Sequence, residues 1–348
     1  MKRNIHILYA LFFLTLARSL DFRFQEFTDN SACGGKILQS QYRYGMANGV
    51  SQVKCALLCA ESDLCKSFQH HKLNRSCQLN DDLDIGDCSK MTDAVDFSYH
   101  EKACLNGGFL KPDGRCACVD GHVGTRCERP MTDCSEGFNS VHGYTNGVYN
   151  IKPMASTTSF PVHCTMKFGG RTRIAYRSLS SVDFYQNWDG YKNGFGDMSG
   201  DHWLGLEKIH LISKPGSYEL KVEAVLKNKS RHQQYYEDTR VADETNGYRI
   251  TFSAVRTPYN KPLGDCLSPL NGSSFSTFDR DNDNQSSGSC AVDYQSGWWF
   301  NACADCNPTG RLLMTVDGLR TNVQHEVYWT NNLGNAVPSV LKLWLVKM

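Results

Sequence analysis

One short segment of the chain concentrates acidic side chains that are candidates for binding a metal ion. In the run STFDRDNDNQSSGSC, Asp279, Asp281 and Asp283 alternate with Arg280 and Asn282. Three carboxylates this close repel one another unless a cation lies among them. Calcium binds six to eight hard oxygens at roughly 2.3–2.6 Å, and a loop with small residues can turn its carbonyl oxygens inward. The segment therefore predicts a calcium site, with a solvated acidic turn as the alternative.

The spacing of these residues does not match an EF-hand. Counting from Asp279, position six is Asn284 where that loop has glycine, and position twelve is Cys290 where it has glutamate. Asn284 also begins an N-x-S/T sequon, so a glycan on it would lie close to the metal and could crowd it.

Other reactive side chains lack the local context of a catalytic site. The sequence contains no nucleophile elbow, no H-E-x-x-H and no Gly-rich phosphate loop. Cys303 and Cys306 have the C-x-x-C spacing of a metal or redox pair, but a structural zinc needs two further ligands. We therefore expect a binding protein and not an enzyme.

Length and composition indicate several globular units. The 348 residues are enough for two or three domains of roughly 100–200 residues each. Hydrophobic residues make up 41% and charged residues 21%, and 37 Lys and Arg residues nearly cancel 36 Asp and Glu residues. This composition is typical of a globular protein and gives no indication of a nucleic-acid partner.

The N-terminus has the pattern of a secretory signal peptide. Lys2 and Arg3 precede an apolar run over residues 7–17 and small residues at Ala17 and Ser19, which predicts a signal peptide over residues 1–19. The run is about half the roughly 20 residues that span a bilayer, so we expect a secreted, extracellular protein without membrane insertion. Four sequons suit that compartment. They begin at Asn74, Asn228, Asn271 and Asn284.

Sixteen cysteines divide the chain into three modules. They form groups of six from Cys33 to Cys88, four from Cys104 to Cys127 and six from Cys134 to Cys306. In an oxidising compartment an even number of cysteines is expected to be paired, and each group can close on itself.

The first cysteine group surrounds a short predicted helix. In CALLCAESDLC, Cys55 and Cys59 lie four residues apart with apolar residues between them, and a hairpin-like stretch follows. This pattern resembles the PAN or apple module over residues 29–101. The resemblance implies three nested disulfides, Cys33–Cys88, Cys55–Cys77 and Cys59–Cys65. Such modules bind proteins or glycans through varied surfaces, and a structural spacer is the alternative.

The second cysteine group, CLNGGFLKPDGRCACVDGHVGTRCE, supplies tight glycine turns and resembles an EGF-like module over residues 102–129. It lacks two of that family's six cysteines. The remaining pairs implied by the resemblance are Cys104–Cys116 and Cys118–Cys127. We expect this module to be a spacer.

The third region contains many Gly, Trp and Asp landmarks. The strings GGRTRIAYRS, SVDFYQNWDGYKNGFGDMSGDHWLGLEKIHLIS and FSTFDRDNDN make residues 132–348 resemble the fibrinogen C-terminal domain family. Period-two alternation in YELKVEAVL and YRITFSAV predicts two half-buried strands, and a short helix is predicted around Trp203 to Leu211. The expected fold class is α+β in a multi-domain secreted protein, with a mixed sheet and a loop-rich calcium subdomain.

The resemblance to the fibrinogen family implies bridges and metal ligands. The implied bridges are Cys134–Cys164 and Cys290–Cys303, and we expect the two cysteines left over, Cys266 and Cys306, to pair with each other. The implied calcium ligands are the side chains of Asp281 and Asp283 and carbonyl oxygens before Cys290. The loop is one residue longer than in the fibrinogen chains, so the carbonyl beside that of Gly288 belongs to Ser286 or Ser287.

The segment after this loop, CAVDYQSGWWFNACADCNPTG, forms a ligand pocket in the family that it resembles. The predicted ligand-binding residues are Asp293, Tyr294, Trp298, Trp299, Ala302, Cys303, Ala304 and Tyr328. For the two tryptophans, burial in the core is the alternative. Many relatives have histidine where this chain has Ala304, and the missing hydrogen bond is commonly worth about 0.5–1.5 kcal/mol.

Two binding functions follow from these resemblances. The first is a calcium-dependent lectin of innate recognition, similar to ficolins and tachylectins, that binds carbohydrate or acetylated groups. The second is an extracellular adhesion, matrix or signalling ligand that binds a protein receptor, like the angiopoietin and tenascin relatives. The sequence has neither a Gly-X-Y stalk nor sustained heptads, so any homo-oligomer would form through module surfaces.

Overall fold

The computed structural model describes residues 27–29, 36–62, 64–82, 90–111, 115–140, 143–178, 182–312, 324–333 and 336–348. The chain divides into two compact units, Met1–Arg129 and Pro130–Met348. The predicted signal peptide and the predicted Cys33–Cys88 bridge lie outside the described residues. Within the described ranges, no helix is both long enough and apolar enough to cross a membrane.

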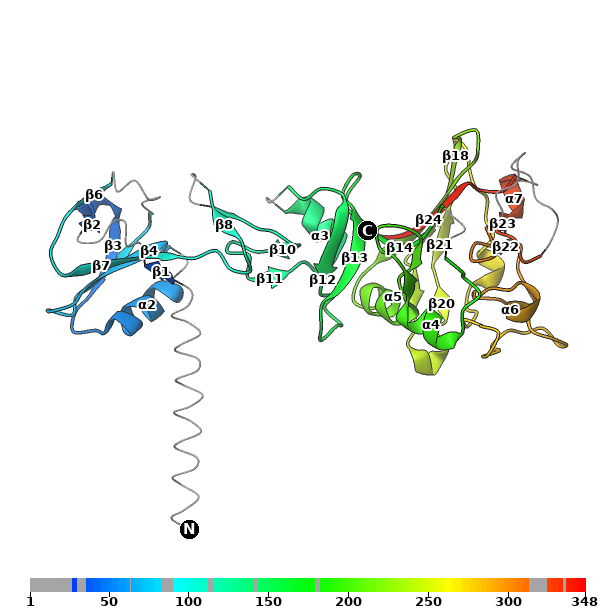
Figure 1. The fold of residues 1–348 in the computed structure, drawn as a ribbon, viewed down its shortest axis with the longest axis horizontal. Coiled ribbons are helices and arrows are strands. Elements are labelled where there is room, and N and C mark those ends of the chain that lie inside the picture. Colours follow the sequence, from blue (N-terminus) through cyan, green and yellow to red (C-terminus); the bar gives the residue numbers. More distant parts are fainter. Residues whose placement is uncertain are drawn as a thin grey trace, which may run out of the picture. The chain divides into compact units, whose positions relative to one another are not determined.

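The first unit consists of short strands and one helix. Its elements are β1 (Phe27–Asp29), β2 (Lys36–Leu38), η2 (Ser40–Tyr42), β3 (Arg43–Ala47), α2 (Gln52–Ala60), β4 (Ser67–His71), β5 (Cys77–Asn80), β6 (Met91–Asp93), β7 (Phe97–Lys102), β8 (Phe109–Leu110), β9 (Cys116–Ala117) and β10 (His122–Val123). An antiparallel sheet has the strand order β1-β7-β4-β5-β3 (Figure 1). The strands β2 and β6, and β8 and β9, form separate pairs, and β10 pairs with β11 (Arg129–Pro130) at the unit boundary.

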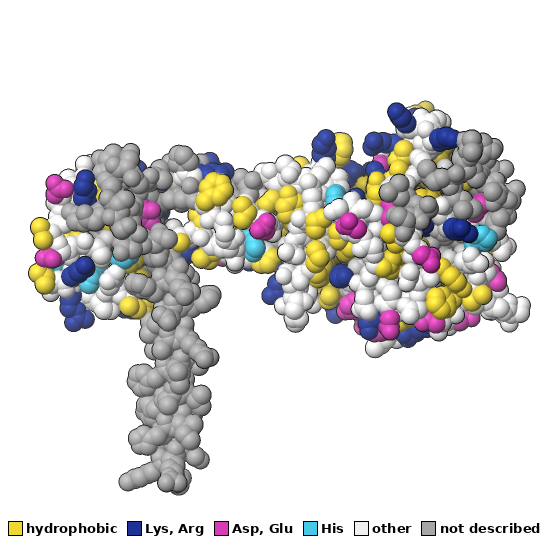
Figure 2. All heavy atoms as spheres, in the orientation of Figure 1, with side chains coloured by type: hydrophobic (Ala, Val, Ile, Leu, Met, Phe, Trp, Pro, Cys, Tyr) yellow, Lys and Arg dark blue, Asp and Glu magenta, His cyan; other side chains and the backbone are white. Residues whose placement is uncertain are grey.

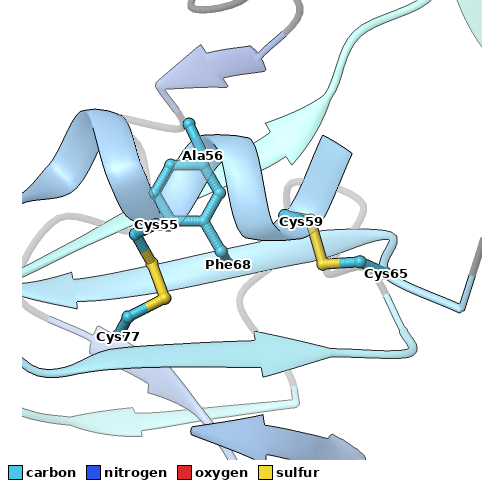
Figure 3. Close-up of a cluster of buried hydrophobic side chains, with 6 residues drawn as sticks. All are labelled: Cys55, Ala56, Cys59, Cys65, Phe68 and Cys77. Atoms are coloured by element: carbon cyan, nitrogen blue, oxygen red, sulfur yellow. A yellow bond between two sulfur atoms is a disulfide. The ribbon is translucent and has the colours of Figure 1, made fainter. Parts of the chain in front are cut away.

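The helix predicted near Cys55 is confirmed as α2. It begins after Ser51, whose side-chain oxygen accepts a hydrogen bond from the Lys54 amide at 3.2 Å, as an N-cap residue does. The disulfides Cys55–Cys77 and Cys59–Cys65 connect the helix to β5 and to the chain just before β4. Figure 3 shows the Phe68 ring on β4 lying between these two disulfides and Ala56. This small core therefore combines two covalent links with apolar packing.

The second unit is larger and is built around one sheet in which every pair of named strands is antiparallel, so the parallel pairs that a mixed sheet would contain are absent from its described strands. Its elements are α3 (Cys134–Asn139), β12 (Gly147–Ile151), β13 (Phe160–Thr165), β14 (Arg171–Arg177), α4 (Trp188–Asn193), β15 (Phe195–Gly196), β16 (His202–Trp203), α5 (Leu206–Ser213), β17 (Tyr218–Val225), β18 (Arg231–Glu237), β19 (Arg240–Val241), η3 (Glu244–Asn246), β20 (Ile250–Thr251), β21 (Ala254–Arg256), η4 (Ser268–Leu270), α6 (Cys290–Asp293), β22 (Cys306–Asn307), β23 (Tyr328–Trp329), α7 (Thr330–Leu333) and β24 (Val340–Lys347). The main sheet has the order β12-β13-β14-β24-β17-β18-β21, with β16 beside β14 and β15 beside β16 (Figure 1).

The strand predicted in YELKVEAVL is present as β17, but the prediction that it is half-buried was wrong. Every residue of β17 except Val225 is buried, because the strand lies between β24 and β18. Its charged face is covered by long side chains: the Lys221 Nζ atom lies 5.4 Å from the ring centroids of both Tyr235 and Trp344. This burial lowers the pKa of Lys221 to about 8.

The strand predicted in YRITFSAV is interrupted. It is divided into β20 and β21, and between them the backbone of Phe252 pairs with a side chain. The Phe252 amide donates to Asn271 Oδ1 at 3.1 Å, and its carbonyl accepts from Asn271 Nδ2 at 3.0 Å. An asparagine amide thus takes the place of a neighbouring strand.

The helix predicted around Trp203 to Leu211 begins later than expected, as α5. Trp203 lies in β16, and Gly205 precedes the helix with φ 110°, a conformation that L side chains rarely adopt. A Cβ atom at Gly205 would lie 2.7 Å from the Asn193 carbonyl carbon, so the close approach also requires glycine.

Candidate functional site

The three aspartates of the acidic loop have different surroundings. Asp279 turns toward the fold, where its Oδ1 accepts hydrogen bonds from the Trp188 amide at 2.9 Å and from Thr277 Oγ1 at 2.7 Å. The Asp281 Oδ1 atom accepts from the Asp283 amide at 3.1 Å. Asp279 therefore holds the start of α4, and Asp281 and Asp283 form the pair within the loop.

Asp283 is the more constrained member of this pair. Its Oδ1 accepts from the Gln285 amide at 2.9 Å, and its Oδ2 accepts from the Cys290 amide at 2.8 Å. Burial raises the pKa of the Asp283 carboxyl, and the neighbouring Asp281 charge raises it further. Two hard oxygen donors are thus held close together at a position where a cation would relieve their repulsion, which fits calcium in chemical type.

Gln285 occupies part of the loop interior. Its Nε2 donates to the Ser287 carbonyl at 2.8 Å and to Asp293 Oδ2 at 3.2 Å. No cluster of three or more His, Cys, Asp or Glu side chains suited to a metal is present among the described residues. A calcium ion in this loop would therefore need backbone carbonyls and water besides its two carboxylates.

Two predicted ligand-binding residues, Trp298 and Trp299, belong instead to the core. Their side chains are 0% and 1% exposed. The Trp299 Nε1 atom donates to the Tyr248 carbonyl at 2.7 Å, and its ring lies against Phe275 with centroids 5.1 Å apart. Pocket-lining tryptophans would need an open face, so this part of the prediction was wrong.

The remaining predicted pocket residues are only partly brought together. Tyr328 is buried, and its hydroxyl donates to the Ala304 carbonyl at 3.0 Å. Its ring centroid lies 6.3 Å from that of Tyr294. Asp293 and Ala302 are exposed, Cys303 is half-buried, and the Ala302–Cys303 peptide is cis. This surface has backbone polar groups and tyrosines, and Ala304 supplies no side-chain donor.

The second unit matches a known family over most of its length. The family of fibrinogen beta and gamma chains, C-terminal globular domain, matches residues 130–342. The chain belongs to the fibrinogen C-terminal domain family. The PAN domain family matches residues 34–104.

Several proteins are similar to the fibrinogen-like domain. Fibrinogen-like protein 1 from Bos taurus is 38% identical over 199 residues, which cover 53% of this chain and 62% of that protein. Angiopoietin-related protein 6 from Mus musculus is 34% identical over 227 residues, which cover 65% of this chain and 47% of that protein. The chain therefore spans less than two thirds of the length of these relatives.

Solved structures share the fold of this domain. The fibrinogen-like globe domain of human ANGPTL6 has a TM-score of 0.57 at 31% identity and covers 63% of this chain and 96% of that one. Lamprey fibrin D-dimer, complexed with the peptide ligand Gly-His-Arg-Pro-amide, has a TM-score of 0.55 at 26% identity and covers 63% of this chain and 74% of that one.

The disulfides of the fibrinogen-like domain exclude the C-x-x-C metal or redox alternative. Cys303 is bonded to Cys290, and Cys306 is bonded to Cys266, so the two cysteines of the motif have different partners. The other described bridges are Cys55–Cys77, Cys59–Cys65, Cys104–Cys116, Cys118–Cys127 and Cys134–Cys164. These are the pairs expected from the sequence.

Arg177 is a residue of this region that the sequence did not single out. Its guanidinium is buried beneath the loop after Cys306, where it donates to the Pro308 carbonyl at 3.4 Å and to the Gly310 carbonyl. It also lies 3.9 Å from the Phe184 ring centroid. Burial lowers the pKa of Arg177 to about 10, although Asp201 raises it. The strand RTRIAYR contains three arginines, so the sequence carried no signal that distinguished Arg177 from the other two.

The four sequon asparagines fall into two structural groups. In Asn74 and Asn228, Oδ1 accepts from the amide of the serine two residues on, at 3.0 and 2.9 Å, and both side chains are exposed. By contrast, Asn271 Nδ2 donates to Phe252 and Asn284 Nδ2 donates to Asn301 Oδ1 at 2.7 Å. The nitrogen that would carry a glycan thus already donates one hydrogen bond within the fold at Asn271 and at Asn284.

When the chain is expressed through the secretory pathway, we expect a glycan on Asn228 but none on Asn271. The Asn271 side-chain amide both donates to and accepts from the backbone of Phe252. It therefore donates through the Nδ2 hydrogen on the same side as Oδ1, and that hydrogen is the one that an N-linked glycan would replace. In electrophoresis before and after deglycosylation, Ser230→Ala should remove one glycan, whereas Ser273→Ala should leave the mass of the secreted protein unchanged apart from the substitution. Loss of a glycan in Ser273→Ala would contradict this expectation.

Proposed function

We propose that this chain is an extracellular, non-enzymatic ligand whose fibrinogen-like domain binds a protein receptor. The observation that carries the proposal is the surface beside the Cys290–Cys303 bridge. There Trp298 and Trp299 are withdrawn into the core, and the Ala304 carbonyl is already bonded to Tyr328. A small acetylated ligand would find few directed side-chain contacts, which supports recognition through a broader surface.

The relatives support the same choice. Fibrinogen-like protein 1 and angiopoietin-related protein 6 fit the second function predicted from the sequence, a signalling or adhesion ligand, better than they fit a lectin of innate recognition. On the visible face of the fibrinogen-like unit, acidic and basic side chains are interspersed (Figure 2). Such a mixed surface is typical of specific protein contacts.

The distinguishing experiment is calorimetry of the full chain with N-acetylglucosamine in calcium. The proposed function predicts no binding, because Ala304 replaces the imidazole expected in acetyl-binding relatives. Calcium-dependent binding of the sugar would contradict the proposed function and would support a lectin. Thermal melting in the same buffer shows that the titrated protein is folded.

An exposed aromatic pair is a candidate anchor for the receptor. Phe278 is 41% exposed, and its ring lies 4.9 Å from that of Tyr185. The next residue, Asp279, is fixed to Trp188, so the pair is held by the core and not by a free loop. Rigid aromatic side chains commonly dominate protein interfaces.

We expect Phe278→Ala to weaken receptor binding by about tenfold, the effect of losing roughly 1.4 kcal/mol at an aromatic anchor. The matched control is Phe168→Ala, which removes another exposed phenylalanine from the same domain. Binding to receptor-bearing cells, measured as a dissociation constant, tests both variants. Equal dissociation constants for the two variants would show that Phe278 is not part of the receptor interface.

We further propose that Asp281 and Asp283 bind calcium together with backbone carbonyls from residues 286–288. The Ser287 carbonyl already accepts a hydrogen bond from Gln285 Nε2. The Ser286 carbonyl is therefore favoured as the calcium ligand beside the Gly288 carbonyl. The ion would order the loop between Asp281 and Cys290. Residues 102–129, with their two bridges, are proposed to form an EGF-like spacer.

Calcium is expected to raise the melting temperature of the fibrinogen-like domain by about 5–10 °C at concentrations near 100 times its dissociation constant. The double variant Asp281→Asn/Asp283→Asn should lose this increase. The control Asp189→Asn removes an exposed carboxylate from α4 and should retain it. A calcium effect that survives in the double variant would place the ion elsewhere.

A further inference from the structure

Two adjacent cavities of the fibrinogen-like domain share one residue, Arg249. The first has a volume of about 320 Å³ and is lined by His210, Lys214, Arg240 and Arg249 together with small and apolar residues. The second has a volume of about 280 Å³ and continues from Arg249 toward Asn282 of the acidic loop. The first shares no lining residue with the surface beside the Cys290–Cys303 bridge described above, whereas the second reaches Asn301, which adjoins Ala302 of that surface.

The first cavity has a positive lining without a carboxylate among its lining residues. Lys214, Arg240 and Arg249 are exposed, and an Arg240 nitrogen donates to the Lys214 carbonyl at 3.4 Å, which holds the two residues together. His210 is buried, and its Nδ1 donates to the Val241 carbonyl at 2.8 Å. This contact fixes the imidazole ring beside the three cationic side chains. These groups can donate several hydrogen bonds to an anion.

The acidic residue next to this cavity is engaged elsewhere. The Asp243 Oδ1 atom accepts from Thr245 Oγ1 at 2.7 Å and from Asn246 Nδ2 at 2.8 Å, which caps η3. These hydrogen bonds hold the pKa of Asp243 below its ordinary value. Among the described residues, Asp243 forms no ion pair with Lys214, Arg240 or Arg249, although its charge acts on the nearby His210.

The second cavity has a different chemistry. Its polar lining consists mainly of amide and hydroxyl groups, from Asn271, Ser273, Ser274, Asn282, Asn284 and Asn301. Several of these amides are fixed: Asn282 Nδ2 donates to the Phe275 carbonyl at 2.7 Å, and Asn301 Nδ2 donates to the Pro269 carbonyl at 3.3 Å. Fixed amides and hydroxyls suit the hydroxyl groups of a sugar, because each can both donate and accept.

We propose that the two cavities together bind a sulfated glycan. The sulfate groups lie against Lys214, Arg240 and Arg249, and the sugar hydroxyls lie along the amide-lined cavity. Arginine matches the geometry of oxyanions with two parallel hydrogen bonds. The site requires Asn271 and Asn284 to be free of glycan, and the pairing of the Asn271 amide with the Phe252 backbone favours this at the first of the two. It does not depend on the identity of the protein receptor.

The test is a titration of the full chain in calcium with a heparin tetrasaccharide. We expect Arg240→Gln/Arg249→Gln to weaken binding by about tenfold at physiological ionic strength, where isolated surface charges are largely screened. The matched control, Lys167→Gln/Arg231→Gln, removes the same charge from exposed positions of the same domain and should change binding by about twofold or less. Thermal melting establishes that both variants are folded.

Three further results separate sulfated glycans from other anions. Desulfated heparin should not bind, a sulfated disaccharide should bind more weakly than the tetrasaccharide, and phosphoinositide vesicles should not compete. Equal losses in the two double variants would show general charge attraction and overturn the proposal. Binding of desulfated heparin, or competition by the vesicles that depends on Arg240 and Arg249, would also overturn it.

Discussion

Arg177→Met is expected to lower the free energy of unfolding of the fibrinogen-like domain by about 3–5 kcal/mol, the range for removing one partner from a buried charged network. Arg177 is 3% exposed, and its guanidinium donates to two backbone carbonyls, those of Pro308 and Gly310. Methionine retains volume but leaves both carbonyls without this donor. It also removes the cation near Asp201, a carboxylate that is itself buried.

Denaturant unfolding of Arg177→Met measures this change. Arg231→Met is the matched control, because the Arg231 side chain is 67% exposed on β18 and lies 4.0 Å from its acidic partner Glu223. The control should lose about 1 kcal/mol or less. Arg177→Lys should also be destabilised, because an ammonium group cannot reach both carbonyls with the arginine fork. Equal stability of Arg177→Met and the control would show that this arginine does not hold the loop.

Removing the Cys266–Cys306 bridge is the second change with a large expected effect. The bonded cysteines are 40 residues apart, for which loop-closure entropy gives about 4 kcal/mol of stabilisation. Both side chains are buried, so alanine is the suitable replacement and serine would add buried hydroxyl groups. The bridge connects the chain before η4 to β22, which pairs with β23.

The Cys290–Cys303 bridge provides the comparison. Its cysteines are 13 residues apart, which gives about 3 kcal/mol by the same relation. Cys266→Ala/Cys306→Ala should therefore be less stable than Cys290→Ala/Cys303→Ala in denaturant unfolding of the full chain. The reverse order would show that the shorter loop depends more strongly on its covalent link than chain entropy predicts.

The local features of this chain could be predicted from sequence where one pattern dominates. Cysteine spacing indicated α2 and its two bridges, and Cys266 and Cys306 were paired as expected because the other cysteines of their group had implied partners. The alternation of apolar and polar residues predicted the position of β17 but not the burial of its charged face. Glu219 and Lys221 look like solvent-facing residues, yet neighbouring strands bring Arg256 and Trp344 over them.

The candidate site shows the same limit. The spacing of Asp279, Asp281 and Asp283 does not reveal that the first faces Trp188, because that contact joins residues far apart in the sequence. The two tryptophans of the predicted pocket are buried for a similar reason. Trp299 contacts Phe275 and Tyr248, and the backbone of Trp298 pairs with Ser276, all of which precede them by many residues. Aromatic residues beside a predicted loop can serve the core or a ligand, and only the packing decides between the two.

The most direct test of receptor binding is a titration of labelled full chain onto cells that bind it, with the cells treated or untreated with protease and with excess N-acetylglucosamine present or absent. The proposed function predicts saturable binding that is lost after protease treatment and is unchanged by the sugar. Binding that survives protease treatment and is displaced by N-acetylglucosamine would contradict it and would identify the fibrinogen-like domain as a lectin.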